Sequence, residues 1–174
     1  MRVYFDNNVV SLEARRSAWA ASALSAIELL RRLESSGHIR ILTSRFTWHE
    51  QSQSTRPEVR SKLEAARPNT PLVENDLVFA GSRRSQVGEG GYFLNAIFTD
   101  IVDPKLHADL LVLGLDASDS KHLMFASVNS CVSLVTLDSD FLDRKPQLQS
   151  RCAPILIESP AEAATRLAAF FGTT

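Results

Sequence analysis

The chain has 174 residues, which is enough for one domain with a buried core but few for two. Hydrophobic residues make up 44% and charged residues 22%, as in average globular proteins, and no stretch reaches the ~18 apolar residues that span a bilayer. The formal net charge of -1 neither supports nor excludes a nucleic-acid substrate, because a small basic patch can coexist with an acidic total. We therefore expect a single domain over residues 1–174 and no membrane span.

The opening segment and the cysteines predict a cellular location. MRVYFDNN places an acidic residue where a secretory signal would need its apolar run. Cys131 and Cys152 are too few for a disulfide framework. Both features favour the reducing environment of the cytoplasm.

Strands and helices are predicted to alternate along the chain. A β-branched and aromatic run stops at Asp6, which indicates a strand followed by a polar loop, and apolar residues at three- and four-residue intervals, Trp19 among them, predict an amphipathic helix. The elements expected are strand 3–5, helix 17–35, strand 39–43, a helix capped by Ser44, helix 57–66, a short strand 72–73, a helical region with a loop over 74–100, helix 104–113, a helix from Asp119 to Val128, strand 132–136, strand 154–157 and helix 160–170. This alternation predicts an α/β fold with a central, mostly parallel sheet covered by helices on both faces.

Acidic residues follow the predicted strands. In open α/β sheets the ligand crevice lies beyond the carboxyl ends of the strands, where Asp6 and Asp138 are expected. Glu50 lies on the helix after the second strand, and Asp119 begins the helix before the strand that leads to Asp138. All four carboxylates could therefore converge on one pocket.

A divalent cation would neutralise such a cluster. Oxygen ligands without cysteine or an obligatory histidine select Mg²⁺ or Mn²⁺ over Zn²⁺. We expect Asp6, Asp119 and Asp138 to contact the metal directly or through water, and Glu50 to orient a water or contribute to a second ion. Asp140 is a possible fifth acid.

Two polar residues are candidates for supporting this site. Asn8 could bond Asp6 or the strand loop, and the Thr136 hydroxyl could steady Asp138 or a substrate phosphate. A cation with open coordination positions can polarise a phosphate and lower the pKa of an attacking water, so hydrolysis of a phosphodiester follows.

Four segments together resemble the PIN-domain nucleases, a family that includes the toxins of bacterial toxin–antitoxin pairs. VYFDNNVV is similar to the family's opening strand with its aspartate, and SRFTWHE to the helix that bears a glutamate. DSKHLMFA is similar to the third acidic helix, and LVTLDSDF to the strand, threonine and paired aspartates. The spacing from Asp119 to Asp138 also resembles that of the family. The order of the four segments spans residues 3 to 141.

The resemblance implies a three-layer α/β/α sandwich and a Mg²⁺- or Mn²⁺-dependent endoribonuclease. It also implies a homodimer that a small antitoxin protein neutralises.

Simpler interpretations exist for the individual residues. Taken alone, Asp6, Asp119 or Asp138 could be a turn or cap residue. Asp116 is close enough to Asp119 to compete for its role in the site, and Glu50 could be a solvated helix residue. A histidine beside an apolar residue is more often a satisfied structural group than a catalytic one, so His122 is left out of the catalytic set. Pairs of arginines are often simply solvated. We expect Arg15 and Arg16 to hold an RNA backbone, because they follow Asp6 closely.

Two rival functions remain open. One is a catalytically idle module of the same fold that binds RNA or a protein partner, against which the intact acids argue. The other is a phosphatase with an aspartate nucleophile, but Asp6-Asn7-Asn8 lacks the paired Asp-x-Asp expected for that chemistry.

Overall fold

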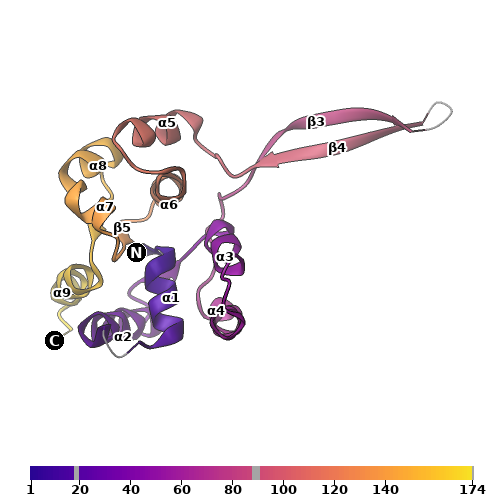
Figure 1. Cartoon of the computed structure of the whole chain (residues 1–174). Coiled ribbons are helices and arrows are strands. Elements are labelled where there is room, and N and C mark those ends of the chain that lie inside the picture. Colours follow the sequence, from indigo (N-terminus) through magenta and orange to yellow (C-terminus); the bar gives the residue numbers. More distant parts are fainter. Residues whose placement is uncertain (18–19, 88–90, 174) are drawn as a thin grey trace.

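A parallel sheet lies at the centre of the structure, a computed structural model that describes residues 1–17, 20–87 and 91–173 (Figure 1). Within these residues the sheet has four strands in the order β2-β1-β5-β6, all parallel to their neighbours. The strands are β1 (Arg2–Phe5), β2 (Arg40–Leu42), β5 (Ser133–Val135) and β6 (Leu156–Glu158). The helices are α1 (Asn7–Arg15), α2 (Ala21–Ser35), α3 (Arg45–Ser52), α4 (Pro57–Ala66), the 3-10 turn η2 (Arg67–Asn69), α5 (Pro104–Val112), α6 (Ala117–Val128), α7 (Ser139–Asp143), α8 (Lys145–Cys152) and α9 (Pro160–Phe171).

The sheet buries both of its faces, because successive side chains of a strand point to opposite sides. Tyr4 belongs to a core formed with α5, α6 and α8, whereas its neighbours Val3 and Phe5 belong to a core formed with α1, α2 and α9. All three side chains are fully buried. The helices on the two faces make the fold a three-layer α/β/α arrangement.

The predicted fold class is thus confirmed. The parallel order follows from the helices that connect successive strands, since parallel neighbours need a crossover of this kind. Among the helices described, none combines the length and the apolarity that a membrane crossing requires.

The prediction of a polar loop after the first strand is wrong. Helix α1 begins at Asn7, because the side chain of Asp6 accepts a hydrogen bond from the Asn7 backbone N–H at 2.6 Å and caps the helix. The next helix begins at Ala21 rather than near Ser17, and Trp19, expected within it, lies outside the described residues. The short strand at 72–73 is reduced to one parallel bridge between Thr43 and Leu72.

The prediction of a helical region over 74–100 is also wrong. It contains β3 (Val78–Val87) and β4 (Gly91–Thr99), which pair antiparallel as a separate two-stranded sheet. The sequence of β4, GYFLNAIFT, is rich in the aromatic and β-branched residues that favour strands. This hairpin extends away from the helices and the central sheet (Figure 1).

The chain between the last two strands of the sheet holds two helices that the sequence pattern did not predict. Asp138 caps α7 by accepting a hydrogen bond from the Asp140 backbone N–H at 2.8 Å, and Pro146 lies in the first turn of α8. As a result, Asp138 is held at a helix start directly beyond the carboxyl end of β5.

Candidate functional site

The two aspartates that follow neighbouring strands lie at one edge of the sheet. Strands β1 and β5 pair in parallel, so their carboxyl ends meet, and the Asp6 backbone N–H donates to the Val135 carbonyl at 3.1 Å. Asp6 follows β1 directly, and Asp138 follows β5 after two residues. Both side chains are fixed at helix N-termini, which favour negative charge.

Two helices supply the other predicted acids. Glu50 lies on α3, whose start is fixed by Ser44 at its N-cap. Asp119 lies in the first turn of α6, where Asp116 is the capping residue and accepts hydrogen bonds from the Ser118 and Asp119 backbone N–H groups at 2.7 and 2.8 Å. Asp116 thus has the capping role, and Asp119 is free of it.

These side chains meet in an open pocket of about 280 Å³. Its lining consists of polar side chains from α1, α3, α6 and the start of α7: Asp6, Asn7, Asn8, Glu50, Asp116, Ser118, Asp119, His122 and Asp138. All four acids predicted from the sequence line it, although they are up to 132 positions apart. Asp140 lies beside it: one carboxylate oxygen from each of Asp119, Asp138 and Asp140 can be chosen so that the three lie within 4.8 Å of one another.

Thr136 and Asn8 connect the two strand ends. The buried Thr136 hydroxyl donates to Asp6 Oδ2 at 2.8 Å and accepts from Asn8 Nδ2 at 3.2 Å and from the Asp138 backbone N–H at 3.0 Å. Asn8 Oδ1 also accepts from the Leu137 backbone N–H at 3.0 Å. Both residues support the site by holding Asp6 and Asp138 in fixed positions, and the bond from Asn8 is to the loop rather than to Asp6.

One side of the pocket, which we call the histidine end, consists of Glu50 and His122. Nε2 of His122 lies 2.9 Å from Glu50 Oε2 and 3.5 Å from Asp6 Oδ1, and Nδ1 lies 2.9 Å from the Tyr4 hydroxyl. The Ser118 hydroxyl donates to the other oxygen of Glu50 at 2.6 Å. Each oxygen of the Glu50 carboxylate therefore has a polar partner.

The opposite side, which we call the aspartate end, consists of Asp119, Asp138 and Asp140. Burial, together with the charges of Asp116, Asp6 and Asp138, raises the pKa of Asp119 to about 7. Arg144 pairs with Asp140 at 2.8 Å, but this pair is at the surface and contributes little. The aspartate end therefore carries negative charge that its protein neighbours do not balance.

The histidine end shows the reverse effect. Burial by itself would raise the pKa of Glu50, but the hydrogen bond and charge of His122 and the hydrogen bond from Ser118 outweigh it and hold this pKa below its ordinary value. Burial opposes the charge on His122, yet Asp6 and Glu50 raise its pKa above the ordinary value. Asp6 lies between the two ends; burial raises its pKa, against the opposing effects of His122 and Thr136.

The aspartate end fits a hard divalent cation. Its donors are carboxylate oxygens, which Mg²⁺ and Mn²⁺ prefer. Mg²⁺ holds its ligands at about 2.1 Å, so two ligands of one ion lie at most about 4.2 Å apart. The three aspartates, within 4.8 Å of one another, need only a small rotation or one bridging water to match this spacing.

Arg15 and Arg16 lie away from the pocket. They end α1, whereas Asp6, Asn7 and Asn8 begin it, and nine residues of helix span about 13 Å. Arg15 Nε donates to the Ser11 carbonyl at 3.1 Å, and Arg16 pairs with Glu28 at 2.6 Å. The structure does not bring the two arginines to the acids.

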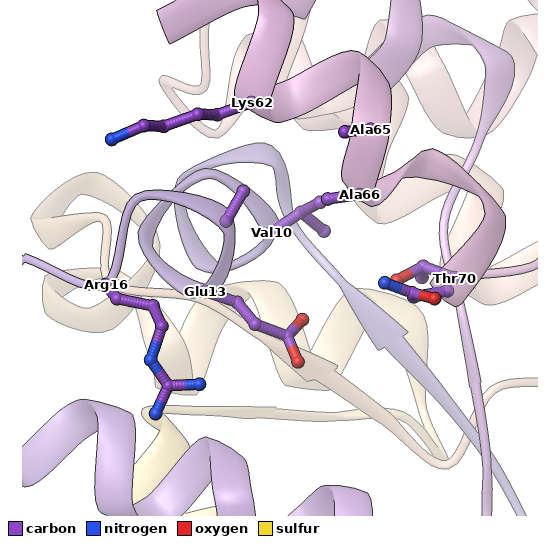
Figure 2. A pocket seen from close by; sticks show the side chains of 9 residues that line it. Val10, Glu13, Arg16, Lys62, Ala65, Ala66 and Thr70 are labelled. Atoms are coloured by element: carbon purple, nitrogen blue, oxygen red, sulfur yellow. The ribbon is translucent and has the colours of Figure 1, made fainter.

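Arg16 instead borders a larger cleft of about 430 Å³ between α1 and α4 (Figure 2). Glu13, the acid of this cleft, is paired with Arg31 at 2.7 Å, and Lys62, Ala65 and Ala66 lie on the α4 side. Its one acid is neutralised within the protein and its walls are partly apolar. The smaller acidic pocket is therefore the candidate functional site.

Sequence reasoning set aside one residue that the pocket includes. His122 is 1% exposed, and its partners are side chains rather than the backbone: Glu50 of the pocket and the buried Tyr4. Ser118 was also missed as a site residue. A signal was present, because positions three and four apart share a helix face, and His122 follows Asp119 by three positions and Ser118 by four.

Comparison of the chain with family models, with curated proteins and with solved structures found no match in any of the three. The fold and the site define an α/β/α protein with an acidic pocket at the carboxyl edge of its parallel sheet.

Proposed function

We propose that this chain is a metal-dependent endoribonuclease that hydrolyses phosphodiester bonds of RNA. The observation that carries the proposal is the convergence of Asp6, Glu50, Asp119 and Asp138 on one open pocket. The resemblance of the four acidic segments to PIN-domain nucleases supports RNA as the substrate, and it extends the proposal to a cytoplasmic toxin, acting as a homodimer, that a small antitoxin neutralises.

Asp119 and Asp138 would hold the metal, with Asp6 and Asp140 as further ligands directly or through water. When bound, Mg²⁺ or Mn²⁺ polarises the phosphate and lowers the pKa of an attacking water. The raised pKa of Asp119 supports this assignment, because a cation at the aspartate end would offset the mutual repulsion of these acids.

The chain's own residues would do the rest. Glu50, kept ionised by His122 and Ser118, would orient the attacking water and accept its proton. Thr136 and Asn8 would keep Asp6 and the Asp138 loop at a fixed separation while the substrate binds.

Cleavage of a mixed set of structured RNAs tests the proposal. The wild type should cut with Mg²⁺ or Mn²⁺ and stop cutting in EDTA, and Asp6→Asn and Asp138→Asn should each lose about 100-fold or more in rate. Asp143→Asn is the matched control, since Asp143 is an exposed aspartate of α7 outside the pocket lining and should leave the rate unchanged.

Two results would contradict the proposal. Cleavage that persists in EDTA would remove the role of the metal, and wild-type rates in both pocket variants would show that the acids are wrongly assigned. DNA of the same sequences, assayed in parallel, separates a ribonuclease from a general nuclease. If no RNA or DNA is cut, the idle binding module becomes the better interpretation.

A further inference from the structure

The arrangement around His122 carries an inference that rests on the proposed function and deepens it. We propose that His122 is a positioning residue of the pocket: it fixes the orientation of the Glu50 carboxylate and is itself fixed by Tyr4. The sequence alone favoured a structural histidine, so the inference depends on its contacts.

The imidazole of His122 has a side-chain partner at each nitrogen. Nδ1 lies 2.9 Å from the Tyr4 hydroxyl and Nε2 lies 2.9 Å from Glu50 Oε2. A ring held at both nitrogens cannot turn without losing a buried hydrogen bond, which is unfavourable. The ring of Phe46 also packs against it, with 5.4 Å between the ring centroids.

Tyr4 anchors this arrangement in the sheet. Its side chain is fully buried on β1, and its hydroxyl donates to Ser44 Oγ at 2.8 Å. Ser44 is the N-cap of α3, the helix that carries Glu50. The hydrogen bonds therefore connect β1, α3 and α6, and they fix the two helices relative to each other at the pocket.

Glu50 receives the effect of this network. His122 engages one carboxylate oxygen and Ser118 engages the other, and a carboxylate has about four lone-pair sites, so two remain for the pocket. An untethered glutamate loses side-chain entropy when it is ordered for catalysis. Here that ordering is complete before the substrate binds, which is the condition for an efficient water-orienting group.

A pair of amide substitutions separates the two sides of the imidazole. In His122→Gln the longer amide places an N–H donor near the position of Nε2 and keeps the bond to Glu50, whereas in His122→Asn the shorter amide reaches toward Tyr4 only. We expect His122→Asn to lower kcat by about 10–100-fold, with KM and metal affinity within about twofold of the wild type. His122→Gln should retain most of the wild-type kcat.

Two further variants complete the design. Tyr4→Phe removes only the hydroxyl that orients Nδ1 and should lower kcat by about three- to tenfold, less than His122→Asn. His107→Asn is the matched control, because His107 is a buried histidine on α5 outside the pocket lining, and its kcat should equal that of the wild type.

Equal kcat losses in His122→Asn and His122→Gln, in proportion to their losses of melting temperature, would overturn the proposal in favour of a structural role. A measurement independent of cleavage is the NMR signal of the His122 Nε2 proton in the metal-free protein. It should exchange slowly with water in the wild type and be lost in Glu50→Ala. If the wild type cuts no RNA, the proposed function fails while this signal still decides whether His122 holds Glu50.

Discussion

The two ends of the acidic pocket contrast in how the protein treats their carboxylates. At the histidine end, Glu50 has a donor on each oxygen and a pKa held below its ordinary value. At the aspartate end, burial and neighbouring acids raise the pKa of Asp119 to about 7, and Asp138 adds to the same crowding. At the histidine end the counter-charge is the buried His122, whereas at the aspartate end it is only the surface residue Arg144, which pairs with Asp140.

Under the proposed function, this difference would give separate tasks to acids that look equivalent in the sequence. Glu50, whose carboxylate is already paired, would act as the positioned base, and the less balanced cluster at the aspartate end would bind the cation. If the cluster is a cation site, it would also weaken the protein when no cation is bound, because function and stability conflict at such sites.

The largest expected effect is thermal stabilisation by metal. At about 100 times its Kd, Mg²⁺ should stabilise the folded chain by about 2.7 kcal/mol, and about 2–4 °C per kcal/mol gives a rise of about 5–10 °C in melting temperature. The rise should vanish in Asp119→Asn and persist in Glu50→Gln, measured by differential scanning fluorimetry at pH 8. The reverse pattern would exchange the roles of the two ends.

A smaller effect is expected from pH. The metal competes with the proton on Asp119, whose pKa is about 7, so the apparent Kd for Mg²⁺ should rise about tenfold between pH 8 and pH 6. Isothermal titration calorimetry at the two pH values measures this ratio. A Kd that does not change between them would show that Asp119 is not a metal ligand.

Melting temperatures in EDTA at pH 8 should move in opposite directions for the two ends. The raised pKa of Asp119 means that its stabilising contribution, present below its unfolded pKa, is lost as the pH rises through about 7, so Asp119→Asn should stabilise the protein. The lowered pKa of Glu50 gives stability above its unfolded pKa, so Glu50→Gln should destabilise it. Solvent screening at these partly exposed groups limits each effect to about 1 kcal/mol, or about 2–4 °C. Melting temperatures that shift in the same direction in both variants would contradict the proposed difference between the two ends.

The smallest effect is expected outside both ends. Arg15 lies at the far end of α1 and bonds the Ser11 carbonyl, so Arg15→Ala should change the KM for RNA by less than about twofold. Cleavage kinetics at low salt, where phosphate contacts weigh most, are the appropriate measurement. A tenfold rise in KM would instead indicate that the RNA path follows α1 and would restore the arginines to the binding surface.

Local patterns in the sequence were sufficient for the fold class and for the acids. Strands and helices with the right periodicity alternate along the chain, and this ordering confines the fold to a parallel sheet between helices. Asp6 and Asp138 could be located because the carboxyl ends of parallel strands share one edge. The prediction of a loop after Asp6 was wrong because the hydrogen bond from the Asn7 backbone to the Asp6 side chain starts α1 there. Periodicity in the sequence does not reveal such a bond.

The region 74–100 shows a second limit. Its glycines and apolar clusters suit an interrupted helix as well as two strands, and the outcome depends on the pairing of β3 with β4, a contact between residues up to 21 positions apart. Short apolar segments are ambiguous for this reason, since their periodicity alone does not separate a strand from a buried helix.

The sequence by itself determined the alternation of strands and helices around a parallel sheet, the acidic character of the site and four of the five acids that line it, because these follow from residue types and short-range spacing. Only the tertiary structure decided how the acids divide into two ends, that His122 bonds Glu50 and Tyr4, and that Arg15 and Arg16 point elsewhere. The physical reason is that burial, charge balance and hydrogen-bond partners arise when distant segments meet. Tyr4, Glu50 and His122 come from three separate elements and touch only in the folded chain.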